Sequence, residues 1–152
     1  MSSQKVLNSV AYARGQWVYH IEWAPKYRYK MFRSETLRNK MTEILQQVAS
    51  EKNIKLLELS VMPDHIHVVA EIPPSMSLAQ ASQIMKGKSS YLFFREYPNM
   101  RLRYPRGHFW SPGKFYRTVG DVDIDRMREY VRYQNDALQT HLISFSQGTP
   151  AL

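Results

Sequence analysis

Two histidines, His65 and His67, are the residues of this sequence best placed for metal chemistry. They lie in the apolar run HIHVVAEI, which predicts a strand from His65 to Ile72. Side chains two residues apart on a strand point to the same face, roughly 7 Å apart, so two imidazoles can lean onto one metal ion. Ile66 and Val68 then face the core. The alternative is a solvated strand face with two histidines, and a His-x-His pair does not exclude it.

A tyrosine near the C-terminus is the second candidate. The sequence predicts a helix from Ile124 to about Leu142. At 100° per residue, one stripe about 60° wide is apolar and predicted to be buried: Ile124, Met127, Val131 and Leu138. Tyr130 and Gln134 lie one turn apart on the flank of this stripe, whereas Tyr133 points towards solvent. We therefore expect Tyr130, and not Tyr133, to reach the sheet. The alternative is a boundary aromatic beside a surface amide.

The charge of the chain connects these residues to nucleic acid. Lys and Arg number 21 against 13 Asp and Glu, a formal net charge of +8, which favours a polyanionic partner, nucleic acid before membrane. A divalent ion can polarise a phosphodiester. A tyrosine that attacks it forms a covalent phosphotyrosine, which a second strand's hydroxyl can later reverse. This chemistry cuts and rejoins DNA rather than hydrolysing it. The sequence identifies no general base.

Seven elements are predicted to position these groups. The length of 152 residues fits one domain, 1–152. Strands are expected at Gln16 to Trp23, Lys55 to Met62, His65 to Ile72 and Lys114 to Val119. Helices are expected after a Ser34 cap, after a Ser77 cap to about Glu96, and from Ile124 to about Leu142. Pro63 and Asp64 form the turn of a hairpin. This order predicts an α+β fold, an antiparallel sheet with helices packed against it.

Two basic segments are candidate DNA contacts. Lys26, Arg28 and Lys30 alternate with tyrosines, so an extended chain would present cations to a DNA backbone and rings to its bases. A solvated edge strand is an equally good interpretation. Three further arginines lie in the segment Pro98 to Gly107, which we predict to be a basic loop: Arg101, Arg103 and Arg106. They are plausible phosphate contacts, or they serve solubility.

Other features exclude some classes of site. The chain has no cysteine, so disulfides, thiolate metal sites and cysteine nucleophiles are excluded. The N-terminal segment lacks the apolar core of a signal peptide and no stretch has the length of a membrane span, so we expect a cytoplasmic protein. His20, His108 and His141 are isolated in sequence and are expected to be structural. Asp64 is interpreted as a turn residue rather than a ligand.

Four blocks of sequence resemble a known family. They are PKYRYKMF near the N-terminus, MPDHIHVV from Met62 to Val69, FWSPGKFYRTVG from Phe109 to Gly120, and EYVRYQN from Glu129 to Asn135. In this order, and spread over most of the chain, they are similar to the single-tyrosine HUH transposases of the insertion-sequence-200-like group. The resemblance implies the ferredoxin- or RRM-like HUH fold.

The resemblance also implies roles for individual residues. His65 and His67 would be the metal ligands with Gln134 as the third, the ion would be Mg²⁺ or Mn²⁺, and Tyr130 would be the nucleophile. The family forms homodimers that bind hairpins at the ends of an insertion sequence. It cleaves single-stranded DNA to a 5′-phosphotyrosine and a free 3′-hydroxyl, and the tyrosine helix of one subunit can complete the active site of the other.

Three alternatives remain from the sequence. Transposases associated with repetitive extragenic palindromes share the fold, but usually carry Asn-Pro where this chain has Gln134 and Asn135. A non-catalytic RRM-like module would carry aromatic pairs on its central strands. A nickase that starts plasmid or phage replication would share the metal site, but such proteins usually have extra domains.

Overall fold

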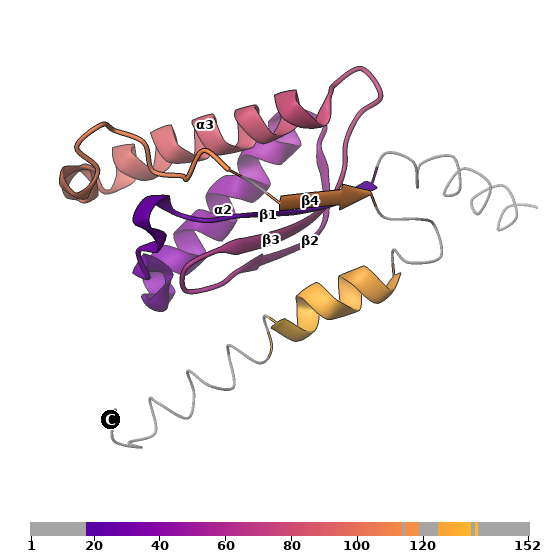
Figure 1. The fold of residues 1–152 in the computed structure, drawn as a ribbon, viewed down its shortest axis with the longest axis horizontal. Helices are drawn as coiled ribbons and strands as arrows, with labels where there is room; N and C mark the ends of the chain where they lie inside the picture. The colour runs from indigo at the N-terminus through magenta and orange to yellow at the C-terminus, as the bar shows by residue number, and fades with distance from the viewer. Residues whose placement is uncertain (1–17, 114, 119–124, 135, 137–152) are drawn as a thin grey trace, which may run out of the picture.

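Four antiparallel strands form one sheet in the computed structural model, which describes residues 18–113, 115–118, 125–134 and 136. The strands are β1 (Val18–Trp23), β2 (Lys55–Val61), β3 (Ile66–Glu71) and β4 (Phe115–Thr118), and their order in the sheet is β2-β3-β1-β4. Helix α2 (Glu35–Glu51) connects β1 to β2, and α3 (Leu78–Glu96) follows β3 (Figure 1). This is the βαββαβ arrangement of ferredoxin-like folds, so the predicted α+β class is confirmed.

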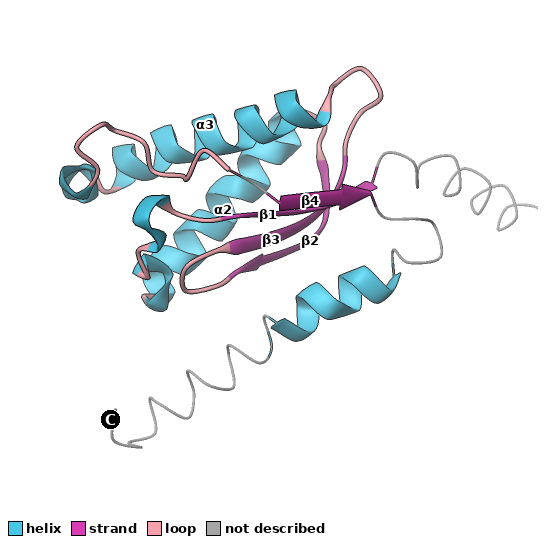
Figure 2. Cartoon of the chain, viewed as in Figure 1, coloured by secondary structure: helices cyan, strands magenta, loops and turns pink. Residues whose placement is uncertain are grey.

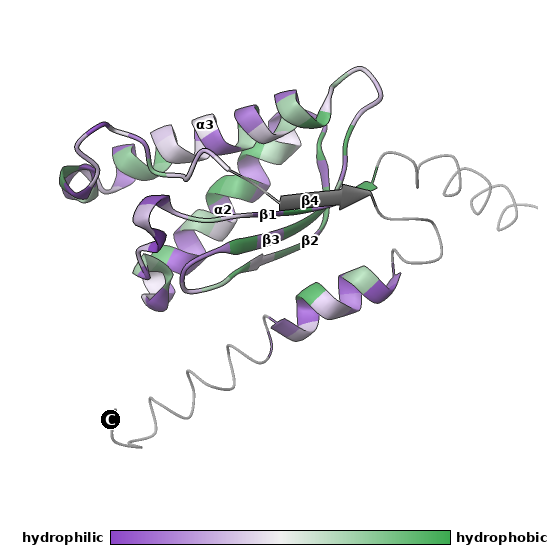
Figure 3. Cartoon of the chain, viewed as in Figure 1, coloured by the Kyte–Doolittle hydropathy of each residue, from purple (hydrophilic) through white to green (hydrophobic). Residues whose placement is uncertain are grey.

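The sheet separates two layers of helix. Figure 1 shows α2 and α3 on one face and the C-terminal helix, residues 125–134 and 136, on the other. Because side chains alternate along a strand, each strand contributes to both layers. Ile66 and Val68 are buried with Ile21 in the main core under α2 and α3, as predicted. Figure 3 shows green, the hydrophobic colour, along β2 and β3 and on parts of α2.

Figure 2 shows α2 and α3 as two long helices, and serine caps begin both of them at the predicted residues. The Ser34 hydroxyl accepts a hydrogen bond from the Leu37 backbone N–H at 3.3 Å. Ser77 and Gln80 form a reciprocal capping box, with bonds of 2.9 and 3.1 Å. Such caps satisfy backbone donors that the first helical turn leaves free, which fixes where each helix starts.

The prediction of an extended segment around Lys26, Arg28 and Lys30 is wrong. Two 3₁₀ turns, Lys26–Arg28 and Met31–Arg33, replace it. Tyr27 and Arg28 have φ of 64° and 50°, outside the range of any strand. The start of the segment is tied by an isolated antiparallel bridge between Pro25 and Trp110, in which the Lys26 N–H donates to the Phe109 carbonyl at 2.7 Å. The cations therefore do not share one face with period two.

The basic segment before Phe109 also differs from the prediction. Pro98–Arg103 form a 3₁₀ helix rather than an open loop, and Tyr104 after it is buried among aromatic rings. One of these rings is Tyr29, whose centroid lies 5.7 Å from that of Tyr104. This contact brings the two basic segments together. Across the described ranges, no helix has the length and apolar character that crossing a membrane requires.

Candidate metal and tyrosine site

His65 and His67 turn the same ring nitrogen towards each other. Their Nε2 atoms are 3.0 Å apart, and the ring centroids are separated by 4.8 Å. His67 lies on β3, while His65 ends the hairpin turn, where its carbonyl accepts the Met62 N–H at 2.8 Å. The predicted pairing of the two imidazoles on one side of the sheet is confirmed.

The spacing of these nitrogens suits a divalent ion. Adjacent ligands of an octahedral ion with bonds of about 2.1 Å lie about 3.0 Å apart. The Nε2 atoms of His65 and His67 are separated by this distance. The pair therefore fits two adjacent positions of one ion, and further positions are left for other ligands.

His20 and Glu22 on β1 lie on the other side of the His67 ring. The Glu22 Oε1 atom is 2.9 Å from His67 Nδ1, and His20 Nε2 is 3.1 Å from the same nitrogen. The His20 and His67 rings stack with centroids 5.3 Å apart. His20 is therefore not isolated in the fold, while the structural role expected for it stays a prediction. A signal was present, because His20-Ile21-Glu22 repeats the two-residue spacing on a strand that pairs with β3.

Two donor sets thus share His67. One is the Nε2 pair of His65 and His67; the other comprises His20, Glu22 and His67, whose ligand atoms lie within 4.8 Å of one another. The first set uses His67 Nε2, and the second uses its Nδ1. The sequence prediction corresponds to the first set. Both sets have spacings close to those of adjacent ligands of one ion: 3.0 Å in the first set, and 2.9, 3.1 and 3.6 Å in the second.

The electrostatic environment keeps His67 neutral. Burial, and after it the nearby charge of His65, lower the pKa of His67 to about 4. Burial raises the pKa of Asp64, but the hydrogen bond from His65 and the positive charges of His65, Arg28 and Lys30 outweigh it and hold that pKa below its ordinary value. A neutral imidazole is the form that binds metal, so His67 is ready to bind at neutral pH.

We expect the metal-free protein to lose stability as the pH falls from about 6.5 to about 4. Folded His67 has a pKa of about 4, while an unfolded histidine has one near 6.5. The unfolded chain therefore binds more protons in this window, and stability rises with pH across it by about 3 kcal/mol from this residue. Urea unfolding in chelator at several pH values measures this slope. A His67→Asn variant with the same slope as wild type would contradict the assignment.

Tyr130 lies over the imidazoles on the described part of the C-terminal helix. Its ring centroid is 6.1 Å from that of His67 and 6.4 Å from that of His20, with edge contacts in both cases. Tyr130 is 47% exposed, whereas Tyr133 is 70% exposed. The prediction that Tyr130 reaches the sheet is confirmed.

Apolar and charged contacts hold this helix on the sheet. Met127 and Val131 pack with Val18, Val69 and the partly buried Leu57 in a second, smaller cluster. The other two residues of the predicted stripe, 124 and 138, lie outside the described residues. Gln134 is half-buried one turn after Tyr130, and the described residues show no hydrogen bond between its amide and either histidine. The third-ligand role of Gln134 stays a prediction.

Glu58 connects β2 to the same helix. Its Oε1 atom accepts hydrogen bonds from Arg128 Nε at 3.3 Å and Arg132 Nη2 at 2.6 Å. The two arginines are one turn apart and bracket Tyr130. One carboxylate thus fixes the helix on either side of the tyrosine.

Replacing Glu58 with alanine is expected to slow any reaction of Tyr130 about five- to tenfold. The arginines are partly exposed, so solvent screens these contacts, and their loss should loosen the helix rather than release it. The affinity for a divalent ion should not change, because the contacts of Glu58 are with Arg128 and Arg132 and not with His65 or His67. Rates of covalent DNA attachment and Mn²⁺ titrations on the same preparations measure the two effects. Equal losses in both would mean that the whole sheet has been disturbed.

A recess of about 500 Å³ opens beside His65. Residues from β1, the first 3₁₀ turn and the 111–113 segment line it, including Glu22, Arg28, His65 and Ser111. Arg28 lies 3.6 Å from Asp64 across the hairpin turn. Of the predicted DNA contacts, Arg28 is therefore the one adjacent to the histidines. Lys30, Arg101, Arg103 and Arg106 are exposed, and Lys26 is half-buried.

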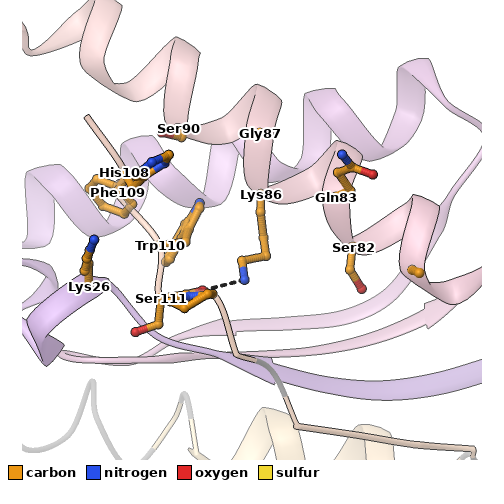
Figure 4. Close-up of a pocket in the computed structure, with 12 residues that line it drawn as sticks. Lys26, Ser82, Gln83, Lys86, Gly87, Ser90, His108, Phe109, Trp110 and Ser111 are labelled. Carbon is orange, nitrogen blue, oxygen red and sulfur yellow. Dashed lines mark hydrogen bonds between the residues drawn. The ribbon is translucent and has the colours of Figure 1, made fainter. Parts of the chain in front are cut away.

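A second recess, of about 450 Å³, lies between α3 and the Phe109 to Pro112 segment (Figure 4). Lys86 reaches from α3 and donates a hydrogen bond to the Ser111 carbonyl at 2.5 Å. Ser111 and Pro112 line both recesses, so this segment separates them. His108 is exposed and lines the second recess, not the one beside His65. Residue 141 lies outside the described residues.

Comparison with known proteins identifies relatives over most of the chain. The family model described as "Transposase IS200 like" matches residues 14–134. The transposase for insertion sequence element IS200 of Salmonella typhimurium is 35% identical over 126 residues, which cover 83% of this chain and 82% of the relative. The ISDra2 transposase TnpA of Deinococcus radiodurans is 26% identical over 118 residues, covering 78% and 84%.

Solved structures agree with this likeness. A crystal structure of a candidate transposase of Deinococcus radiodurans matches with a TM-score of 0.62 and 26% identity, over 78% of this chain and 90% of that one. The REP-associated tyrosine transposase bound to a REP hairpin matches with a TM-score of 0.56, over 76% and 64%. At 11% identity the second likeness supports the fold alone.

Proposed function

This chain belongs to the IS200-like transposase family, and on that premise we propose that it cleaves and rejoins single-stranded DNA at the ends of an insertion sequence through a metal-dependent 5′-phosphotyrosine intermediate. Tyr130 is the nucleophile, and His65, His67 and Gln134 bind the ion, Mg²⁺ or Mn²⁺. The proposal treats residues 1–152 as one transposase domain.

One observation carries the proposal. The Nε2 atoms of His65 and His67 converge to 3.0 Å, and the Tyr130 ring lies 6.1 Å from the His67 ring. Metal-binding nitrogens and a phenol are thus side by side on one sheet face. On that face the described side chains of β1 and β3 include His20, Glu22 and His67, whereas an RRM-like binding module carries aromatic pairs on its central strands.

When bound, the divalent ion supplies Lewis-acid polarisation of the phosphoryl oxygens. The histidines orient towards it by their Nε2 atoms. Arg28 lines the recess beside His65 and adds a positive charge close to the histidines, where the scissile phosphate would bind. Glu58 and the small apolar cluster hold the C-terminal helix so that Tyr130 faces this position.

The covalent step forms one bond and breaks one. The Tyr130 Oη atom attacks the phosphorus of the scissile phosphodiester and loses its proton to water. The bond from phosphorus to the 3′-oxygen breaks, and that oxygen takes up a proton to become a free 3′-hydroxyl. The phosphotyrosine retains the energy of the diester, so the 3′-hydroxyl of another strand can attack it and release Tyr130.

The proposed DNA contacts follow from charge and position. The two basic segments meet through Tyr29 and Tyr104, so their cations can act on one DNA backbone. We assign phosphate contacts to six residues: Lys26, Arg28, Lys30, Arg101, Arg103 and Arg106. Such contacts contribute affinity without sequence information, and binding should weaken steeply with salt.

The partners that we propose are hairpin-forming single-stranded DNA and a second copy of the chain. The described contacts hold Tyr130 over the His67 of its own chain. They support attack in cis, while exchange of the helix between subunits is the arrangement that the family resemblance implies. Mixing the His65→Ala and Tyr130→Phe proteins separates the two arrangements.

Covalent capture tests the function directly. Purified protein is mixed with Mn²⁺ and single-stranded oligonucleotides copied from the DNA flanking its gene, and denaturing gels with mass spectrometry detect an adduct. We expect an adduct that requires metal and single-stranded DNA. Tight binding of the same strand without any adduct would favour a non-catalytic DNA-binding protein.

A further inference from the structure

Each of the two histidines has a carboxylate oxygen within hydrogen-bond distance of its Nδ1 atom, the ring nitrogen that does not face the other histidine. His67 Nδ1 lies 2.9 Å from Glu22 Oε1, and His65 Nδ1 lies 2.8 Å from Asp64 Oδ1. We propose that Glu22 and Asp64 are positioning residues that keep both imidazoles in the Nδ1–H tautomer and thereby direct both Nε2 lone pairs at one ion. The proposal rests on the metal role of the histidines in the proposed function.

The chemistry of carboxylates supports this tautomer. An ionised carboxylate can only accept hydrogen bonds, so the imidazole nitrogen that faces it must carry the hydrogen. In a neutral imidazole the other nitrogen is then an unprotonated acceptor. This applies to Nε2 of His67 and, by the same contact, to Nε2 of His65. Two lone pairs 3.0 Å apart cannot bond to each other, but both can bind a cation placed between them.

The backbone fixes each carboxylate without help from a metal. Glu22 is directly opposite His67 in the β1–β3 register, on the same face of the sheet. Asp64 is in the hairpin turn next to His65, and Arg28 restrains its other oxygen at 3.6 Å. The site is therefore preorganised, since neither ring has to rotate before it binds an ion. Removing a residue that hydrogen-bonds to a metal ligand typically weakens metal binding 10- to 100-fold.

The competing arrangement uses the same residues differently. If His20, Glu22 and His67 were the ligands, the ion would take His67 Nδ1, and Glu22 would bind the metal itself. The two arrangements disagree on which nitrogen of His67 carries hydrogen in the metal-free protein. They also disagree on whether His20 or His65 is required for binding.

The tautomer can be measured without DNA or metal. Long-range ¹H–¹⁵N correlation spectra of the metal-free protein distinguish Nδ1–H from Nε2–H imidazoles. We expect the Nδ1–H form for His65 and His67 in the wild type, and a shift of His67 towards Nε2–H in Glu22→Ala. Glu22→Gln keeps an acceptor oxygen and should retain the wild-type tautomer. An Nε2–H form of His67 in the wild type would overturn the proposal.

Calorimetric titration with Mn²⁺ gives the second readout. Glu22→Ala is expected to bind about 10- to 100-fold more weakly, Glu22→Gln to recover most of this loss, and His20→Ala to stay within about threefold of wild type. Glu35→Gln, which removes an equal charge at the exposed start of α2, is the matched control. The proposal fails if Glu22→Ala binds normally. It also fails if Glu22→Gln is as weak as Glu22→Ala while His20→Ala binds as poorly as His65→Ala.

The two proposals can fail separately. If the protein shows these tautomers and affinities but forms no DNA adduct, the positioning role of Glu22 and Asp64 stands and the proposed transposase chemistry fails. If a metal-dependent adduct forms on Tyr130 and Glu22→Ala binds Mn²⁺ as tightly as wild type, the transposase chemistry stands and the positioning role fails.

Discussion

Tyr130→Phe is expected to abolish covalent attachment to single-stranded DNA, a loss of at least about 10⁴-fold, while DNA binding and Mn²⁺ affinity stay at the wild-type level. The substitution removes only the phenolic oxygen, which forms the bond to phosphorus. The ring, its edge contact with His67 and the apolar cluster beneath the helix are retained. Denaturing gels with labelled oligonucleotide, and peptide mapping of the adduct, measure the effect.

Tyr133→Phe is the matched control on the same helix. Tyr133 is 70% exposed, so its loss should change the rate by less than about twofold. An adduct that survives Tyr130→Phe and disappears with Tyr133→Phe would show that the wrong tyrosine was assigned.

His65→Ala is expected to reduce covalent attachment by about 10³-fold and to remove measurable Mn²⁺ binding, because a single imidazole does not hold the ion that polarises the phosphate. His65 is the better choice for this experiment, since its partly exposed side chain can be removed with little effect on folding. His67 is 4% exposed, and its removal could also disturb the sheet. Titration calorimetry, adduct yield and circular dichroism on one preparation distinguish these effects.

His108→Ala is the control, because His108 is exposed and lies on the recess between α3 and the Phe109 segment. Unchanged Mn²⁺ binding in His65→Ala would refute the assigned site. Mixing His65→Ala with Tyr130→Phe tests the arrangement of subunits. If the tyrosine acts in cis, the mixture stays inactive, whereas restored attachment would show that one chain's helix completes the other chain's site.

Local patterns in the sequence predicted the elements that carry the site. The alternation around Ile66 and Val68 placed these residues in the core, so His65 and His67 had to lie on the opposite side of the sheet. Helical periodicity separated Tyr130 from Tyr133, because a helix rotates about 100° per residue. Ser34 and Ser77 marked the starts of two helices, since a cap is a contact between near neighbours. In each case the physical cause acts over a few residues.

The alternation of residue types gave a wrong prediction where contacts between residues far apart in sequence decide the backbone conformation. The tyrosines and cations after Pro25 predicted an extended chain, yet one backbone bond to Phe109 and the burial of Met31 and Phe32 favour two 3₁₀ turns. The positive φ of Tyr27 is a cost that only such tertiary contacts can offset.

The sequence by itself determined the α+β fold, the histidine pair and the tyrosine that faces it, because period and spacing suffice to place side chains on one face of a strand or helix. Only the tertiary structure decided what surrounds His67. Glu22 and His20 are more than forty residues away along the chain, and the β1–β3 register alone brings them to its Nδ1 atom. Strand pairing is a long-range choice made by the packing of the whole sheet, and no local pattern encodes it.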